Sequence, residues 1–321
     1  MRASSVETVA AGALPSPPAI VLKVVQQVSS PDCALPDLSQ LISADPSLSA
    51  ALLQSVNSAY YRPKQPVTTV QRAVALLGLQ AVRNLVLCIA ARGLFAPPEG
   101  FPIDRFWEIS LRRAASAKLL AQHLGDRDGD ELFTLGLLQD IGVLTATTLH
   151  PDLAPELTEL LGHPLRRRLH RERELGVPHD ALGQQLLHHW QLDEAFVAPV
   201  GAHHGQAKDP SGRAEILAAA DALADLVVVE DKLVALADVE ARLSKLGIGA
   251  TQLSELLGDI DQVIEVSAEM LGISTGPQPE LSDIMAVAAA GLADITMGYQ
   301  QAVKELQSSL ERERAMAEQL E

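Results

Sequence analysis

Apolar residues recur at the spacing of an α-helix along most of this chain, and this periodicity constrains the fold more than any other feature. Val21, Val24, Val25 and Val28, for example, would share one helical face. Apolar residues make up 47% of the 321 residues but aromatic residues only 3%, so the core must consist mainly of Leu, Val, Ile and Ala. Clusters of β-branched residues are few and short, which disfavours a sheet. The sequence therefore predicts an all-α fold.

Helix boundaries are marked by capping residues, proline and glycine. Asp45-Pro46 predicts a helix start, because an N-cap carboxylate precedes a proline in the first turn. Gly78 predicts the end of a short helix over Val70 to Leu77. Further along, the apolar pattern predicts one helix from Glu131 to Leu149.

The chain divides into five predicted segments. A proline-rich break at 96–100 (APPEG) separates two helical groups, and Ser274 to Pro279 forms a second linker. The segments are a flexible N-terminus (1–13), an N-terminal helical lobe (14–96), a second helical lobe (97–230), accessory helices (231–275) and a long C-terminal helix (281–321).

The C-terminal segment carries a heptad pattern with charged flanks, which is typical of a coiled coil. The a and d positions are Leu292, Tyr299, Val303, Leu306, Leu310, Ala317 and Leu320, with Glu313 interrupting the series. The alternative is a single amphipathic helix that packs on the body of the protein. Because the pattern is still in progress at Glu321, we expect another domain to follow in the natural protein.

The charge balance bears on the partners. The formal net charge is −16, and a surface this acidic repels phosphate backbones, so we expect no nucleic-acid partner. The basic exception is the run from Arg166 to Arg171, which reads RRRLHR. This run either pairs with acidic neighbours, meets a phosphate or forms a solvated helix face.

Cysteine usage and the apolar runs indicate the compartment. The two cysteines, Cys33 and Cys88, have neither the number nor the spacing of a disulfide framework or a metal knuckle. The N-terminus has no signal-peptide pattern. The long apolar run from Ile216 to Val229 is broken by Asp221 and Asp225 and is shorter than the ~20 residues that span a bilayer. We expect a cytoplasmic protein with no membrane span.

Four motifs in the first quarter of the chain follow one another in a characteristic order. They are LPSPP (14–18), ISADPSL (42–48), LQSVNSAYY (53–61) and AVALLGLQ (73–80). This ordered series resembles the HDOD domain (HD-related output domain) of bacterial signalling proteins, over roughly residues 14 to 225. The resemblance implies an all-helical, two-lobed fold, with an N-terminal lobe peculiar to the family and a lobe similar to HD phosphohydrolases. Such domains often occur beside response-regulator or diguanylate cyclase modules, which implies a role in cyclic di-GMP signalling.

The resemblance also implies that two metal-binding positions have been lost. HD phosphohydrolases hold one or two divalent metals with a His, an adjacent His-Asp pair, further His residues and a final Asp. Gln139 stands where the His of the His-Asp pair is expected, and Ile109 stands at the position of the first His. A neutral amide is a poor ligand and an aliphatic side chain is none.

The remaining positions of the resemblance are retained. The residues that match ligand or near-ligand positions are Asp140, His179, His203, His204 and Asp221. If they converge, they supply enough donors for a weak or altered site with one divalent metal. The alternative is a hydrogen-bonded polar patch in a helical core, because buried polar groups need partners. We expect no other cofactor.

Three functions are open at this point. The first is a non-catalytic regulatory module that binds a protein partner or small ligand and passes a change through its C-terminal helix to an output domain, as a homodimer. The second is a metal-dependent phosphohydrolase or phosphodiesterase that uses Asp140, His179, His203 and Asp221. The third is a nucleotide sensor that binds its ligand in the altered cleft without hydrolysing it.

Overall fold

A computed structural model describes residues 13–28, 30, 32–126, 128–205, 212–276, 282–287, 289, 290, 297 and 301 of the chain. Within these residues there are fifteen labelled α-helices and no strand, which confirms the predicted all-α, two-lobed fold. The predicted N-terminal segment 1–13 lies outside the described residues except for Ala13.

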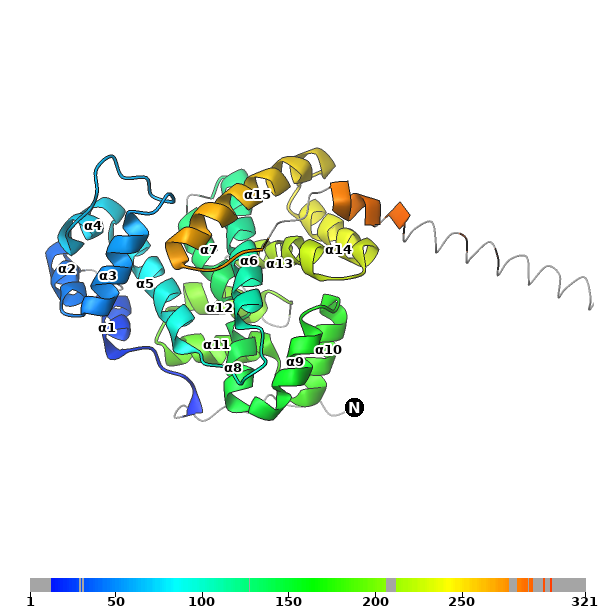
Figure 1. The fold of residues 1–321 in the computed structure, drawn as a ribbon, viewed down its shortest axis with the longest axis horizontal. Coiled ribbons are helices and arrows are strands. Elements are labelled where there is room, and N and C mark those ends of the chain that lie inside the picture. The colour runs from blue at the N-terminus through cyan, green and yellow to red at the C-terminus, as the bar shows by residue number, and fades with distance from the viewer. Residues whose placement is uncertain are drawn as a thin grey trace, which may run out of the picture.

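The N-terminal lobe gathers at one end of the molecule (Figure 1). Its helices are α1 (Ala19–Val28), α2 (Leu35–Ser43), α3 (Pro46–Val56), α4 (Val70–Leu77) and α5 (Leu79–Leu94). The predicted start at Asp45-Pro46 is confirmed, because the Asp45 carboxylate accepts a hydrogen bond from the Leu48 backbone N–H at 2.9 Å. The predicted end at Gly78 is also confirmed: its φ of +80° turns the chain between α4 and α5.

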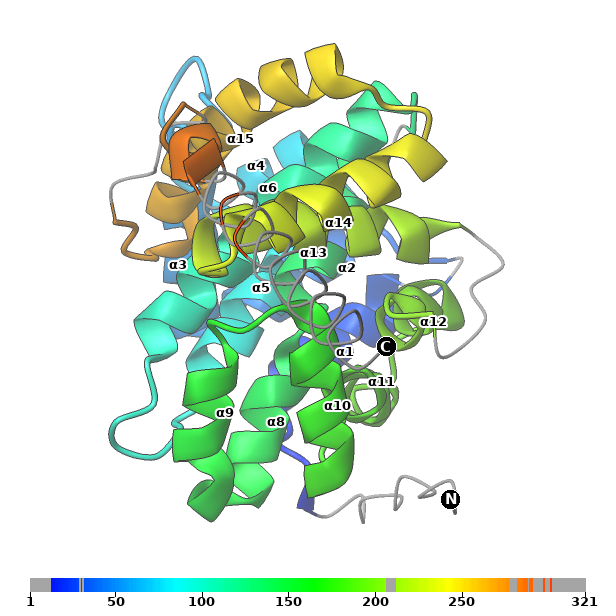
Figure 2. The same cartoon turned by 90° about the vertical axis from the view of Figure 1, so that its right-hand side faces the viewer.

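The second lobe is built around α6 (Ile103–His123), which packs against α7, α13 and α15 through the middle of the molecule (Figures 1 and 2). The other helices are α7 (Gly129–Leu138), α8 (Ile141–Leu149), α9 (Ala154–Leu160), α10 (Leu165–Leu175), α11 (His179–His189), α12 (Glu194–Ala202), α13 (Arg213–Val228), α14 (Lys232–Lys245) and α15 (Ala250–Leu271), with the 3₁₀ turn η2 (Pro151–Leu153) before α9. One continuous apolar core joins the two lobes, from Val24 in α1 to Leu217 in α13. The lobes are therefore packed as one body.

The predicted single helix from Glu131 to Leu149 is wrong, because the chain breaks into α7 and α8 at Gln139 and Asp140. Asp140 has φ −101° and ψ +15°, outside the α-helical region, and its side chain makes no capping bond to α8. As shown below, buried side chains from other helices engage its carboxylate instead. Tertiary contacts thus override the local helical pattern.

The segment from Gly129 to Leu149 has the length and hydropathy of a membrane span, which the sequence prediction did not recognise. However, 89% of its most apolar window is buried inside the fold. That burial is typical of helices in a protein core.

The chain leaves the body after α15. Gly272 ends this helix with a φ of +61°, and the Gly276 backbone N–H donates to Glu108 Oε1 at 3.1 Å. Residues 282–287, 289, 290, 297 and 301 are helical. The rest of the predicted C-terminal helix, with every a and d position of its heptads, lies outside the described residues, so the coiled coil stays a prediction.

Helices α8 and α11 approach each other unusually closely, and this contact sets the position of the site described below. A Cβ atom on Gly142 would lie 1.9 Å from the His179 carbonyl oxygen and 2.7 Å from the Gly183 nitrogen. Only a glycine in α8 allows this approach.

We therefore expect Gly142→Ala to destabilise the protein by about 3 kcal/mol or more, because backbone atoms must move apart. The matched control is Gly258→Ala in α15, where no atom lies within 4 Å of the added Cβ. That control should stabilise the protein by roughly 0.5–1 kcal/mol. Urea unfolding followed by circular dichroism measures both, and equal midpoints for Gly142→Ala and the wild type would contradict the close contact.

Candidate metal site

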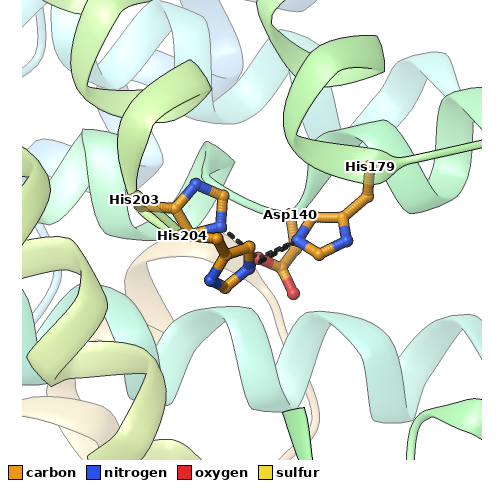
Figure 3. Close-up of side chains that lie close together, drawn as sticks. All are labelled: Asp140, His179, His203 and His204. Atoms are coloured by element: carbon orange, nitrogen blue, oxygen red, sulfur yellow. Dashed lines mark hydrogen bonds and ion pairs between the residues drawn. The ribbon is translucent and has the colours of Figure 1, made fainter. Parts of the chain in front are cut away.

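Four side chains from three separate segments of the chain converge at one point of the second lobe. They are Asp140 from the α7–α8 turn, His179 at the start of α11, and His203 and His204 directly after α12 (Figure 3). One ligand atom from each lies within 4.8 Å of the ligand atoms of the other three. Three of the four residues are buried, and His204 is partly buried.

Two of the histidines are oriented by partners at their outer nitrogens. His203 Nδ1 lies 2.6 Å from the Val200 carbonyl oxygen, which can only accept, so Nδ1 carries the hydrogen and the Nε2 lone pair faces the cluster. His179 Nδ1 lies 2.5 Å from Glu172 Oε2. A carboxylate or carbonyl behind a histidine is the usual support of a metal-ligating imidazole.

Two of the atoms that face the centre of the cluster, Asp140 Oδ1 and His203 Nε2, lack a hydrogen-bond partner among the described residues. His203 Nε2 and His179 Nε2 lie 3.4 Å and 3.6 Å from Asp140 Oδ1. Both Asp140 Oδ1 and His203 Nε2 are buried. Two buried acceptors that point at a shared space fit a cation between them. Three imidazoles and one carboxylate could hold Zn²⁺ or another divalent transition metal.

The pKa values of His179 and His204 are shifted in opposite directions. Burial alone would lower the pKa of His179, but the carboxylates of Glu172 and Asp140 outweigh it and raise that pKa to about 9. Burial and the two neighbouring imidazoles hold the pKa of His204 well below its usual value. A protonated His179 can therefore donate to His204, whose Nε2 lies 2.9 Å from His179 Nε2. This bond leaves the two acceptors named above unsatisfied.

Asp221, which the sequence offers as a further ligand, is not part of this set. Its Oδ1 lies 2.7 Å from Arg113 Nε, and the same guanidinium reaches Asp140 Oδ2 at 2.9 Å. The Arg113 side chain is 1% exposed. Asp140 therefore faces the histidines with one oxygen and a guanidinium with the other, and Arg113 separates Asp221 from the cluster.

The two substituted positions lie in the protein interior. Ile109 is buried in α6, one helical turn before Arg113. Gln139 is fully buried, and neither polar atom of its amide has a partner among the described residues. Neither side chain belongs to the convergent set, as expected from their chemistry.

Two residues that matter here were not singled out in the sequence. Glu172 supports His179 from seven positions upstream, and Arg113 lies between Asp140 and Asp221. No local pattern marks either residue, because both act across helices. The one sequence feature that could have drawn attention to Glu172 is its negative charge within the Arg-rich helix α10.

The Arg-rich run pairs mainly with acidic neighbours. Arg168 is buried and contacts Asp225 at 2.9 Å and Asp221 at 3.4 Å, while Arg171 pairs with Glu156 and Glu174. Of the three interpretations of this run, pairing with acidic side chains describes these two arginines. Arg166 and Arg167 are exposed, as the solvated-face interpretation expects.

Comparison with known proteins identifies the chain's relatives. The model of the HDOD domain family matches residues 14–206, which is more than half of the chain. The crystal structure of a candidate phosphohydrolase from Shewanella amazonensis SB2B gives a TM-score of 0.63 at 26% identity, covering 84% of this chain and 98% of that one.

Two further relatives extend the comparison. The structure of an HDOD domain protein of unknown function from Geobacter sulfurreducens has the same fold, with a TM-score of 0.61 at 22% identity over 80% of this chain and 93% of that one. An uncharacterized protein of Treponema pallidum (strain Nichols) is 26% identical over 198 residues. That alignment covers 60% of this chain but only 37% of the Treponema protein, so this chain spans well under half of its length.

Behind the histidines, the guanidiniums of Arg113 and Arg168 pair with three buried carboxylates, so one negative charge is in excess. The carboxylates are those of Asp140, Asp221 and Asp225. Burial raises the pKa of Asp225 to about 7 against the pull of Arg168, and the neighbouring Asp221 adds to the rise. Because the folded-state pKa is raised, this group contributes stability at low pH that is lost as the pH rises through about 7.

We expect the free energy of unfolding of the wild type to fall relative to that of Asp225→Asn between about pH 4 and pH 7, by up to about 1.4 kcal/mol per pH unit. Urea unfolding at a series of pH values measures this difference. Asp152→Asn removes an exposed carboxylate and should run parallel to the wild type. A difference between wild type and Asp225→Asn that stays constant with pH would show that Asp225 does not hold the proton.

Proposed function

Because this chain belongs to the HDOD family, we propose that it is a regulatory module of signal transduction that holds one divalent metal as a structural element and does not hydrolyse phosphate esters. The metal would be held by Asp140, His179, His203 and His204. A divalent metal supplies Lewis acidity when a coordination position is open. In this chain its role would be to fix α8, α11 and the end of α12 to one another.

The observation that carries this proposal is the number of protein ligands. Structural zinc sites are closed by four protein side chains, whereas catalytic sites keep a position open for water or substrate. Here four side chains converge within 4.8 Å, and Asp140, His179 and His203 are buried. A metal in this set would have its four positions filled by protein.

Arg113 supports the same conclusion from the other side of Asp140. Two-metal hydrolysis needs a second cation a few ångströms from the first, held by carboxylates that bridge or flank the pair. The carboxylates of Asp140 and Asp221 instead share a guanidinium, which cannot ionise a water. Ile109, one helical turn before Arg113 in α6, supplies no imidazole to this part of the site.

One observation favours the enzyme as a second candidate. His204 is the least buried of the four residues, and its Nδ1 has no hydrogen-bond partner among the described residues. If His204 swung away, Asp140, His179 and His203 would leave a coordination position open. The Shewanella protein, 26% identical, is described as a candidate phosphohydrolase.

The proposal extends to partners. The helix that follows Gly272 would connect the module to an output domain and pair two copies of the chain, since coiled-coil helices have discrete registers that a signal can shift. Met285 and Val287 at its beginning are 51% and 54% exposed, while Ile284 is buried against the body. The exposed Met285 and Val287 support the proposed homodimer. We further propose a cytoplasmic location and, with a diguanylate cyclase-type output domain, a role in cyclic di-GMP signalling.

For the metal, we expect plasma mass spectrometry of protein purified without chelator or histidine tag to find about one divalent metal per chain. His179→Ala should abolish binding, and Glu172→Gln should weaken it by about 10–100-fold through loss of the support behind His179. The matched control is His188→Ala, an exposed histidine on the same helix, which should keep the full metal content.

The same preparations distinguish the two candidate functions. We expect no hydrolysis of bis(p-nitrophenyl) phosphate with Mn²⁺, Fe²⁺, Zn²⁺ or Mg²⁺. Turnover that disappears in His179→Ala but persists in His188→Ala would overturn the non-catalytic role and favour the phosphohydrolase. No metal in any preparation would overturn the structural role of the site.

For the partner, we expect light scattering to show a dimer for the full chain at micromolar concentration and a monomer for a chain that ends at residue 290, which keeps the buried Ile284 and removes every heptad position. The apolar face of the C-terminal helix is the reason, because its burial requires a second helix. The shortened chain should keep the circular dichroism and unfolding midpoint of the body. A monomeric full chain at high micromolar concentration would contradict the dimer.

A further inference from the structure

A cavity of about 440 Å³ opens where the N-terminal lobe meets the end of α15. Its walls come from α3, α5, α6 and residues 270–272, and it shares no residue with the histidine cluster. The volume lies in the range of small-molecule binding sites. In Figure 1, α15 ends beside α3, so the cavity sits at the junction of the two lobes.

Two opposite charges line this cavity without neutralising each other. Arg92 from α5 and Asp104 from α6 are both exposed, and neither side chain has an ion-pair or hydrogen-bond partner among the described residues. They therefore do not pair with each other. Their charges are available to a ligand that carries an anionic group and a cationic group at once.

The rest of the lining is largely apolar. Ile89, Ile103, Trp107 and Leu271 contribute apolar surface, and the Trp107 ring is held in place by an edge-to-face contact with Phe106. A pocket of this kind binds an apolar group, while a few polar groups fix its orientation. The ligand class is thus a small zwitterion with an apolar side chain.

The cavity also touches the point where the chain leaves the body. Ser55 Oγ donates to the Met270 carbonyl oxygen at 3.1 Å, and Arg92 Nη1 lies 3.2 Å from where a Cβ on Gly272 would stand. Gly272 ends α15 before the linker to the C-terminal helix. A ligand that binds Arg92 would therefore lie beside Gly272, at the start of the linker to the C-terminal helix.

We propose that this cavity binds a free α-amino acid with an apolar side chain. Its carboxylate pairs with Arg92, its ammonium group pairs with Asp104, and its side chain packs against Trp107. This inference goes beyond the proposed function and does not depend on a metal at the histidine cluster.

The test is isothermal titration of the full chain with three related probes. L-phenylalanine carries both charges, 3-phenylpropanoate lacks the ammonium group, and 2-phenylethylamine lacks the carboxylate. We expect L-phenylalanine to bind with at most millimolar Kd and each of the other two to bind about tenfold more weakly or worse, since each loses one charge-assisted hydrogen bond.

Exposed variants assign each charge to its residue without disturbing the core. Arg92→Gln should weaken the binding of L-phenylalanine about tenfold and leave the affinity for 2-phenylethylamine unchanged. Asp104→Asn should likewise weaken the binding of L-phenylalanine about tenfold and leave the affinity for 3-phenylpropanoate unchanged. Arg72→Gln, an exposed arginine of α4 outside the cavity, is the matched control and should bind like the wild type. No binding of L-phenylalanine at millimolar concentration, equal affinity for all three probes, or wild-type affinity in both cavity variants would each overturn the proposal.

Discussion

The second lobe depends on the two buried ion pairs that Arg113 makes with Asp140 and Asp221. Arg113 joins α6 to the α7–α8 turn through Asp140 and to α13 through Asp221, at distances of 2.9 Å and 2.7 Å. Breaking such a pair by removing one partner leaves an uncompensated buried charge, which costs about 3–5 kcal/mol. Arg113 therefore fixes α6, the α7–α8 turn and α13 to one another without the help of a metal.

This bridge also explains why the site differs from a two-metal centre. One oxygen of Asp140 is committed to Arg113, and the other faces His179 and His203. The Arg113 guanidinium thus occupies one side of Asp140, and the proposed metal would bind on the other side. Glu172 and the Val200 carbonyl orient the imidazoles of His179 and His203 from behind, as the proposed single-metal site requires.

Much of the fold could be predicted from the sequence, because its signals are local. The cap at Asp45 and the turn at Gly78 act within a few residues, and both predictions are confirmed. The break at Asp140 and the roles of Glu172 and Arg113 could not be predicted, since each depends on side chains from distant helices. The candidate ligands were predicted from resemblance to a family, and only coordinates could show that four of them converge while Asp221 stands apart.

The central claim is that one metal is held by protein side chains alone. X-ray absorption spectroscopy of the purified protein at the edge of its bound metal tests this most directly. We expect three imidazole nitrogens and one carboxylate oxygen around a single metal, with no scattering from a second metal. A metal–metal distance of about 3.5–4 Å, or a site in which water replaces an imidazole, would contradict the claim and favour catalysis.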